Sequence, residues 1–486
     1  MHFAQFWPIV PWKTFSADST DFDELSLLRR TWPRSILFQG VTPDRKITEG
    51  ASCREVSSSM GQLASEKSKV TSAEKAVAVA DNRRNVSSQE LREHWDANGF
   101  LSAPPPRINL DANANAAPTP KVVAAVVRAL HNSANPSSAH AAGDEARVQL
   151  EKARDAVSAL CRGVYPENVI FTSGCTEANN LVVATAKALG ATLITTAVEH
   201  PSVLRPAYEL RAAGYDVRII PVDAEGRVEL PRLQEELQIA PGLIVLSVQT
   251  ANSETGVLQP IGEIAAVAAE RKDVLFHSDA AQGFGKFELP LGGPDGPDVV
   301  TVSAHKLHGP TGVGAILMRG GEDRLRPLLV GGDQERGLRA GTQSLPLIAG
   351  FGAACEERLA HLSSHVAHMV LLRDRLEAGV LAALPGVTVS GVGGTRLPNT
   401  SNLRFPGVEA MAMVALLDAE GVLASQGSAC HSRRPEPSPV LMAMGISEAD
   451  AFSAVRFSVS PLNTAAEIDA AISIIVQAYQ SSGFRT

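Results

Sequence analysis

The sequence lacks the features that mark membrane, secreted and nucleic-acid-binding proteins. None of its apolar runs is long enough to span a bilayer. Its first residues, MHFAQFWPIVPWKTF, have neither the basic start nor the apolar core of a secretory signal, and the acidic residues between 18 and 24 argue against a transit peptide. The net charge is −8 and no basic block is present. We therefore expect partners that are neither nucleic acid nor membrane.

Cysteine is also scarce, with five residues in 486. A sparse, odd number fits a reducing compartment and predicts a cytoplasmic location. Cys161 and Cys355 lie in helical apolar patterns, which predict core positions. Cys430 lies in ASQGSACHSRRPEPSPV, where Gly, Ser and Pro predict an exposed loop. The adjacent Arg433 and Arg434 favour its thiolate, although a bystander thiol is the simpler alternative.

The chain changes character near residue 105. Residues 1–105 are rich in serine and charge, weakly periodic, and lead into the linker-like SAPPPR (102–107). We predict a disordered or loosely helical extension, or else a start assigned upstream of the true protein. The rest is long enough for two domains. We predict a large domain over 121–359, and a smaller α+β domain formed by 106–120 and 360–486.

Short β-branched runs alternate with amphipathic stretches in the central part of the chain. This alternation predicts an α/β fold with a mostly parallel, seven-stranded sheet and helices on both faces. Ligands of such sheets bind at the carboxyl ends of the strands. The seven predicted strands are 168–173, 192–198, 216–222, 242–250, 273–279, 298–304 and 314–319. The C-terminal part instead predicts helices near 355–384, 408–421 and 465–480.

Three candidate groups lie at or just after predicted strand ends. Lys306, in TVSAHKLHGPTGVG, follows a buried strand, where its charge is costly. Asp279 ends VLFHSD, and its carboxylate suits a protonated ring nitrogen, although a helix N-cap is the simpler interpretation. The first amides of the helix after FTSG, those of Cys175 and Thr176, suit a phosphate, with a capping box as the alternative. We expect these groups to converge on one crevice.

Histidines and a serine supply further candidates. His200, in VEHPSV, suits stacking or proton transfer, although a satisfied loop histidine is the simpler interpretation. Ser303 and His305 flank Lys306 and are placed to reach the same phosphate. His305 and His308 have the spacing of a metal pair, but no third ligand lies nearby, so we predict no metal site.

Seven segments, in the same order along the chain, resemble those of the cysteine desulfurases, pyridoxal 5'-phosphate (PLP) enzymes of aminotransferase class V. The resemblance covers about 106–480 and implies a PLP-dependent transferase of fold type I. The GSAC form of the cysteine loop resembles the group that serves nitrogenase and iron–sulfur cluster assembly. The segments are NPSSAHAAGDEAR (135–147), FTSGCTEANN (171–180), VEHPSVL (198–204), HSDAAQGFGK (277–286), SAHKLHGPTGVGAI (303–316), ERGLRAGTQSLPLIAGFGAA (335–354) and GSACHSRRPEPSPVLMAMGI (427–446).

The resemblance implies a role for each residue around the cofactor ring. Lys306 would be the Schiff-base lysine, and its apolar position would lower its pKa and make the amine a nucleophile. Asp279 would keep the pyridine nitrogen protonated, and His200 would stack on the ring. Gln282 would bond the ring hydroxyl, either alone or together with Ser253, which stands where the family has an asparagine and is shorter.

The resemblance also implies the phosphate, substrate and sulfur sites. Thr176, Ser303, His305 and the backbone of Cys175 would hold the phosphate. Thr342 would complete that site in the other subunit of a homodimer. Arg456 would bind the carboxylate of L-cysteine. The thiolate of Cys430 would take the sulfur as a persulfide, releasing L-alanine, and pass it to an acceptor or an iron–sulfur scaffold protein. These roles rest on the place of each residue in the seven segments, except that of Arg456, which lies in AVRFSVS (454–460) and matches the family there.

Three alternatives remain open at this point. A selenocysteine lyase would share the motifs. Another class V aminotransferase would need no loop cysteine, so it would stay active without Cys430. A non-catalytic sulfur-transfer partner could retain the fold, but intact Lys306, Asp279 and Cys430 argue against it.

Overall fold

The computed structural model describes residues 107–132, 134–289, 296–320, 324–427 and 436–482. All of them belong to one compact unit, Ser102–Thr486. The predicted extension, 1–105, lies outside the described residues. Among the helices in these ranges, none has the length and apolar character needed to cross a membrane.

Within the described ranges, seven strands form the large sheet in the order β2-β8-β7-β6-β5-β3-β4. Strands β3 to β7 run parallel to their neighbours in this set, and β8 is antiparallel to both β2 and β7. The predicted fold class is confirmed. The strands are β2 (Val169–Thr172), β3 (Thr192–Thr196), β4 (Val217–Ile220), β5 (Ile244–Ser247), β6 (Val274–Asp279), β7 (Val299–Ser303) and β8 (Gly314–Met318).

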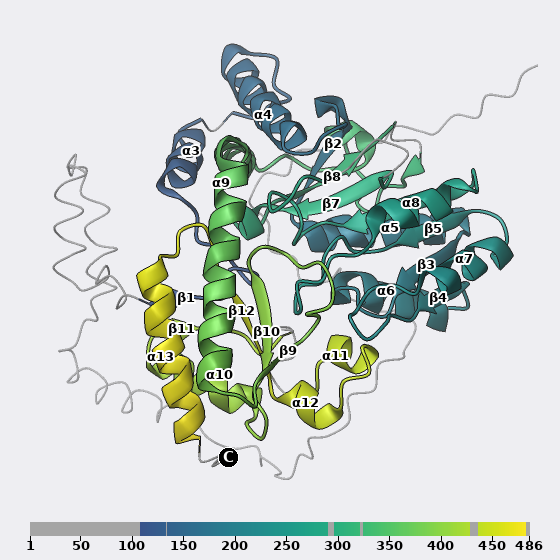
Figure 1. Cartoon of the computed structure of the whole chain (residues 1–486). Coiled ribbons are helices and arrows are strands. Elements are labelled where there is room, and N and C mark those ends of the chain that lie inside the picture. Colours follow the sequence, from purple (N-terminus) through teal and green to yellow (C-terminus); the bar gives the residue numbers. More distant parts are fainter. Residues whose placement is uncertain (1–106, 133, 290–295, 321–323, 428–435, 483–486) are drawn as a thin grey trace, which may run out of the picture. The chain divides into compact units, whose positions relative to one another are not determined.

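Helices cover both faces of this sheet because alternate strand residues point to opposite sides. On one face, Ile170 and Leu193 pack under α5 (Cys175–Leu189) and α6 (Pro201–Ala212). On the other, Ile194 packs under α7 (Leu230–Ile239) and α8 (Ile261–Ala269). Figure 1 shows these helices against the strands.

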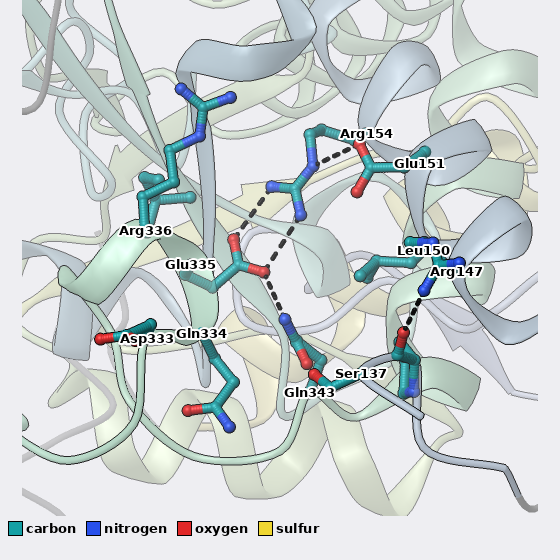
Figure 2. Close-up of a pocket in the computed structure, with 12 residues that line it drawn as sticks. Ser137, Arg147, Leu150, Glu151, Arg154, Asp333, Gln334, Glu335, Arg336 and Gln343 are labelled. Carbon is teal, nitrogen blue, oxygen red and sulfur yellow. Dashed lines mark hydrogen bonds and ion pairs between the residues drawn. The ribbon is translucent and has the colours of Figure 1, made fainter. Parts of the chain in front are cut away.

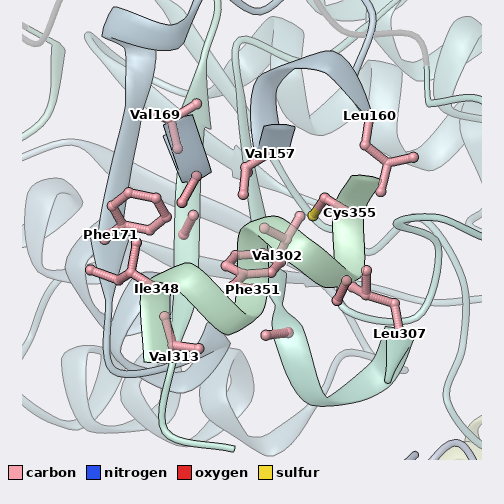
Figure 3. Close-up of a cluster of buried hydrophobic side chains, with 14 of the residues drawn as sticks. Val157, Leu160, Val169, Phe171, Val302, Leu307, Val313, Ile348, Phe351 and Cys355 are labelled. Carbon is pink, nitrogen blue, oxygen red and sulfur yellow. The ribbon is translucent and has the colours of Figure 1, made fainter. Parts of the chain in front are cut away.

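The second face continues into a core beneath three more helices, α3 (Pro120–Leu130), α4 (Ala141–Ala159) and the first part of α9 (Leu345–Ala383). Phe171 and Phe351 meet there edge to face at 6.5 Å between ring centroids (Figure 3). Cys161 and Cys355 are buried in this core, as predicted. Burial raises the pKa of Cys161 to about 12, so its thiol is inert.

The C-terminal part packs on a smaller sheet of the described residues, in the order β12-β10-β9. Helix α9 reaches it from the large sheet, with a break in helical geometry at His361, and lies beside α13 (Figure 1). The predicted domain boundary at 359–360 falls within α9 and stays a prediction. The elements are β9 (Thr388–Val389), β10 (Thr400–Arg404), β12 (Ala454–Ser458), α10 (Ala410–Ala419), α11 (Pro439–Ala443), α12 (Glu448–Phe452) and α13 (Ala465–Ser481).

The first described strand pairs with a strand of the C-terminal part. β1 (Ile108–Asn109) pairs in parallel with β11 (Val422–Leu423). Just after β1, Asp111 bridges to Ser458 at the end of β12. The β1–β11 pair and the bridge to β12 fix the position of residues 111–114, which reach the site described below.

Candidate active site

A cavity of about 480 Å³ opens at the carboxyl ends of β6 and β7, where the α/β pattern places ligands. Ten predicted site residues line it. Thr342 is exposed and is not among the lining residues. Cys430 and its two arginines, Arg433 and Arg434, lie outside the described residues. The ten lining residues are Cys175, Thr176, His200, Ser253, Asp279, Gln282, Ser303, His305, Lys306 and Arg456.

Lys306 lies in the short 3-10 helix η2 (Ala304–Leu307), directly after β7. Its ammonium donates to the carbonyl oxygens of Asn113 at 2.5 Å and Ala114 at 2.9 Å. Burial, then the positive charge of Arg456, lowers its pKa to about 8. About a tenth of the amine is therefore unprotonated at pH 7, far more than in an ordinary lysine, and the strand-end position predicted a shift in this direction.

Asp279, the last residue of β6, accepts hydrogen bonds from three donors. Asn179 Nδ2 lies 2.7 Å from Oδ2, and the amide of Ala281 lies 2.9 Å from Oδ1. The third donor is the thiol of Cys175, with Sγ 3.4 Å from Oδ1. Burial and the Asp279 charge raise the pKa of Cys175 well above its ordinary value, so the thiol stays protonated and donates. This side-chain contact was not predicted, because Cys175 was expected to contribute only its backbone.

Asn179 links Asp279 to His200. Its amide also donates to Ser202 Oγ at 2.8 Å, and Ser202 Oγ lies 2.7 Å from His200 Nδ1. The backbone N–H of Ser202 donates to the same nitrogen at 3.1 Å. Nδ1 is therefore an acceptor, which leaves the ring proton on Nε2. Burial lowers the pKa of His200, so the ring is neutral.

Neither Asn179 nor Ser202 was predicted. A usable signal existed for Asn179, because Cys175 and Asn179 are spaced i,i+4 on α5 and share a helix face. The network continues through Thr301, whose hydroxyl donates to Asn179 Oδ1 at 2.5 Å. His277 Nε2 lies 3.0 Å from the same hydroxyl. These buried groups fix the orientation of the Asn179 amide.

The N-terminus of α5 forms one end of the cavity. Its N-cap residue is Gly174, and no side chain caps the helix, so the predicted capping-box alternative is wrong and its first amides have no capping partner. Gly174 approaches another glycine closely, because a Cβ on Gly314 would lie 2.8 Å from its Cα. Ser303 Oγ and His305 Nδ1 lie 2.7 Å apart nearby, and burial and Lys306 lower the pKa of His305 to about 4.

Arg456, on β12, supplies a cationic group to the cavity. Its guanidinium donates to the carbonyl of Ser253 at 3.1 Å and to Asp111 at 2.7 Å. Its Nε is buried and has no hydrogen-bond partner within the described residues. An unpaired buried donor on a cavity-lining arginine suits a carboxylate ligand.

These groups fit PLP. The uncapped helix end with Thr176 suits the phosphate, and Asp279 suits a protonated pyridine nitrogen. Lys306 lines the cavity with an amine that suits the aldehyde, and Gln282 lines it with an amide that suits the ring hydroxyl. Since each polar group of the cofactor has a chemically matched residue among the lining side chains, the site is suited to this cofactor.

A second cavity of about 480 Å³ lies beside the segment that carries Thr342 (Figure 2). Its buried centre is an ion pair in which Arg154 donates to both oxygens of Glu335, at 2.9 and 3.1 Å. Glu335 also accepts from the amide of Phe171 and from the side chain of Gln343. Glu335 has a left-handed φ of 47°, which these contacts stabilise.

Comparison with known proteins gives a family. The family described as aminotransferase class V matches residues 108–471. The chain belongs to the class V aminotransferases. The predicted family and its PLP cofactor are thereby confirmed.

Individual relatives agree with this assignment. A cysteine desulfurase of Enterobacter agglomerans is 40% identical over 369 residues, covering 75% of this chain and 90% of the relative. A protein of Azotobacter vinelandii named cysteine desulfurase NifS is 41% identical, covering 70% and 84%. The X-ray structure of a NifS-like protein from Rickettsia africae is 30% identical, has a TM-score of 0.70, and covers 77% of this chain and 100% of that one.

Proposed function

We propose that this chain is a cysteine desulfurase that takes the sulfur of L-cysteine onto Cys430 and releases L-alanine. The observation that carries the proposal is Lys306, an amine of pKa about 8 in a cavity that also holds Asp279 and Arg456. The curated relatives at about 40% identity bear the name cysteine desulfurase.

Each residue contributes a distinct step. Bound PLP supplies an electron sink for the electrons of the substrate Cα–H bond. Arg456 binds the substrate carboxylate, which places the Cα hydrogen within reach of Lys306. Lys306, as free amine, accepts that proton. His200 holds a proton on Nε2 and is a neutral donor at the same cavity.

Sulfur transfer needs a thiolate at this cavity. Gly427, three residues before Cys430, lines it, as does Val440 on α11. Ser438, at the start of α11, donates to the buried carboxylate of Glu254 at 2.5 Å. The chain on both sides of Cys430 is therefore held at the cavity. The Cys430 sulfur bonds to the substrate sulfur, and the substrate Cβ–S bond breaks with its electron pair going to Cβ. Cβ then gains a proton, and Lys306 returns a proton to Cα to give alanine.

The exposed Thr342 supports a homodimer in which it reaches the phosphate site of the second copy. Its loop is anchored rather than free, because Gln343 donates to the buried Glu335 and Arg339 pairs with Glu177 on α5. Exposed apolar side chains, Leu329 and Val330, precede it.

The persulfide then passes to an acceptor protein in the cytoplasm, for iron–sulfur cluster assembly or another sulfur-transfer pathway.

The test is production of alanine and sulfide from L-cysteine by wild type and by Cys430→Ser, with Cys53→Ser as the matched cysteine control. We expect Cys430→Ser to bind L-cysteine but release no sulfur, because a hydroxyl does not accept sulfur as a thiolate does. Mass spectrometry should locate the persulfide on Cys430. A persulfide on Cys161, Cys175 or Cys355 with Cys430 unmodified would refute the assignment of the nucleophile.

A further inference from the structure

Lys286 is a buried lysine behind the cavity that the proposed mechanism does not use. It is 4% exposed and does not line the cavity. Its amine donates to Asn113 Oδ1 at 2.9 Å and to Gln282 Oε1 at 3.0 Å. Among the described residues it forms no ion pair with a carboxylate. Burying an amine against neutral partners is costly, so its presence calls for a function.

A tight turn brings Lys286 back onto Gln282. The turn needs glycine at two positions. Gly285 has a φ of +71°, and a Cβ on Gly283 would lie 2.6 Å from Thr250 Oγ1. Phe284, between the glycines, is fully buried in the core and fixes the turn. The position of the amine is therefore set by the fold.

Burial is the main reason that the pKa of Lys286 lies well below its ordinary value, and nearby cations add to the effect. These are Lys306, Arg358 and Arg456. A neutral amine still carries two N–H donors, which is the number that Asn113 and Gln282 accept. The two contacts therefore persist in either protonation state.

The contact decides which way the Gln282 amide faces. An N–H donor requires Oε1 opposite it, so Nε2 must point to the other side. One Nε2 hydrogen goes to the carbonyl of Asn113 at 3.0 Å, the carbonyl that also accepts from Lys306. The second hydrogen is left for the cavity, which Gln282 lines. Ser253, in place of the family's asparagine, supplies no second amide at this wall.

We propose that Lys286 is a positioning residue: it holds the Gln282 amide with an N–H toward the cavity, so that Gln282 donates to the ring oxygen of bound PLP. This inference rests on the proposed function only for the cofactor and its orientation. A fixed donor stabilises the anionic form of that oxygen and so lowers the pKa of the bound cofactor.

The experiment is a pH titration of the absorbance of PLP-loaded protein, for wild type, Lys286→Met, Gln282→Leu and the double variant. We expect Lys286→Met to raise the spectroscopic pKa by about 0.5 to 1 and to weaken cofactor binding about ten-fold, since one hydrogen bond to a charged group is lost. In the Gln282→Leu background, Lys286→Met should add little to either quantity, because Lys286 acts through Gln282.

Additive shifts in the double variant, or an unchanged spectroscopic pKa in Lys286→Met, would overturn the proposal. Lys286→Gln, which is too short to reach both oxygens, replaces Lys286→Met in the cycle if the methionine variant does not fold. Wild-type protein that binds no PLP would refute the proposed function instead, so the two failures are distinguishable. Thermal denaturation of the apo variants separates a loss of fold from a loss of orientation.

Discussion

Lys306 gives a quantitative prediction for the protein without cofactor. Its pKa is lowered from an ordinary value of 10.5 to about 8, first by burial and then by Arg456. A difference of about 2.5 in pKa makes the free amine about 300-fold more abundant at pH 7 than in an ordinary lysine. We expect its reaction with trace acetic anhydride, followed by mass spectrometry, to reach half its maximum near pH 8. Lys152, 74% exposed at its side chain, provides the internal reference for reagent chemistry.

Arg456→Met extends the same test. Without the cation of Arg456, the pH of half-maximal Lys306 acetylation should rise. The charge of Arg456 lowers the Lys306 pKa, and its loss leaves Asp111, whose charge raises that pKa, without its partner. The lowered pKa of Lys306 also determines how folding stability changes with pH. Between pH 8 and 10.5 the unfolded chain holds one more proton on this lysine than the folded chain, so folding stability should rise with pH in that window. A wild-type midpoint at pH 10 or above would refute the reasoning.

Three further predictions concern residues around the site. Glu335→Gln removes the buried charge partner of Arg154 and should lower the free energy of unfolding by about 3 to 5 kcal/mol, measured by denaturant titration. Glu151→Gln removes the exposed partner of the same arginine and should change the free energy of unfolding by less than about 1 kcal/mol. Asn179→Ala removes a donor to Asp279 and should weaken PLP binding about ten-fold by fluorescence titration, whereas an unchanged affinity would mean the contact is incidental. A chain that starts at Pro104 retains β1 and should bind PLP and dimerise normally; insolubility would place residues 1–103 within the fold.

Local sequence patterns predicted much of this fold. The β-branched and apolar runs marked all seven strands of the large sheet, because strands that are buried on both faces read as short apolar segments. The order of strand and turn also placed Lys306 and Asp279 correctly, since both lie where a strand ends. Periodicity within one segment was sufficient for these assignments.

Local sequence patterns could not predict contacts between distant segments. Asn113, whose carbonyl accepts from both Lys306 and Gln282, lies 193 positions before Lys306, and nothing in its own neighbourhood marks it. The thiol of Cys175 faces Asp279 because α5 packs on β6, a tertiary arrangement that a motif does not encode. Lys286 stood in a recognised segment, but its role depends on a turn that folds back onto Gln282.

The pairing of β1 with β11, and of Asp111 with Arg456, has a consequence for biosynthesis. The cavity wall draws on residues from Asn113 to Arg456, and the Asp111–Arg456 ion pair spans 345 positions. A ribosome releases these segments in order, so β1 and Asp111 must wait for their partners until β11 and then Arg456 have emerged. The nascent chain can form much of the large sheet beforehand, yet Lys306 lacks Arg456 until then. The complete cofactor site therefore forms only after Arg456 has emerged from the ribosome.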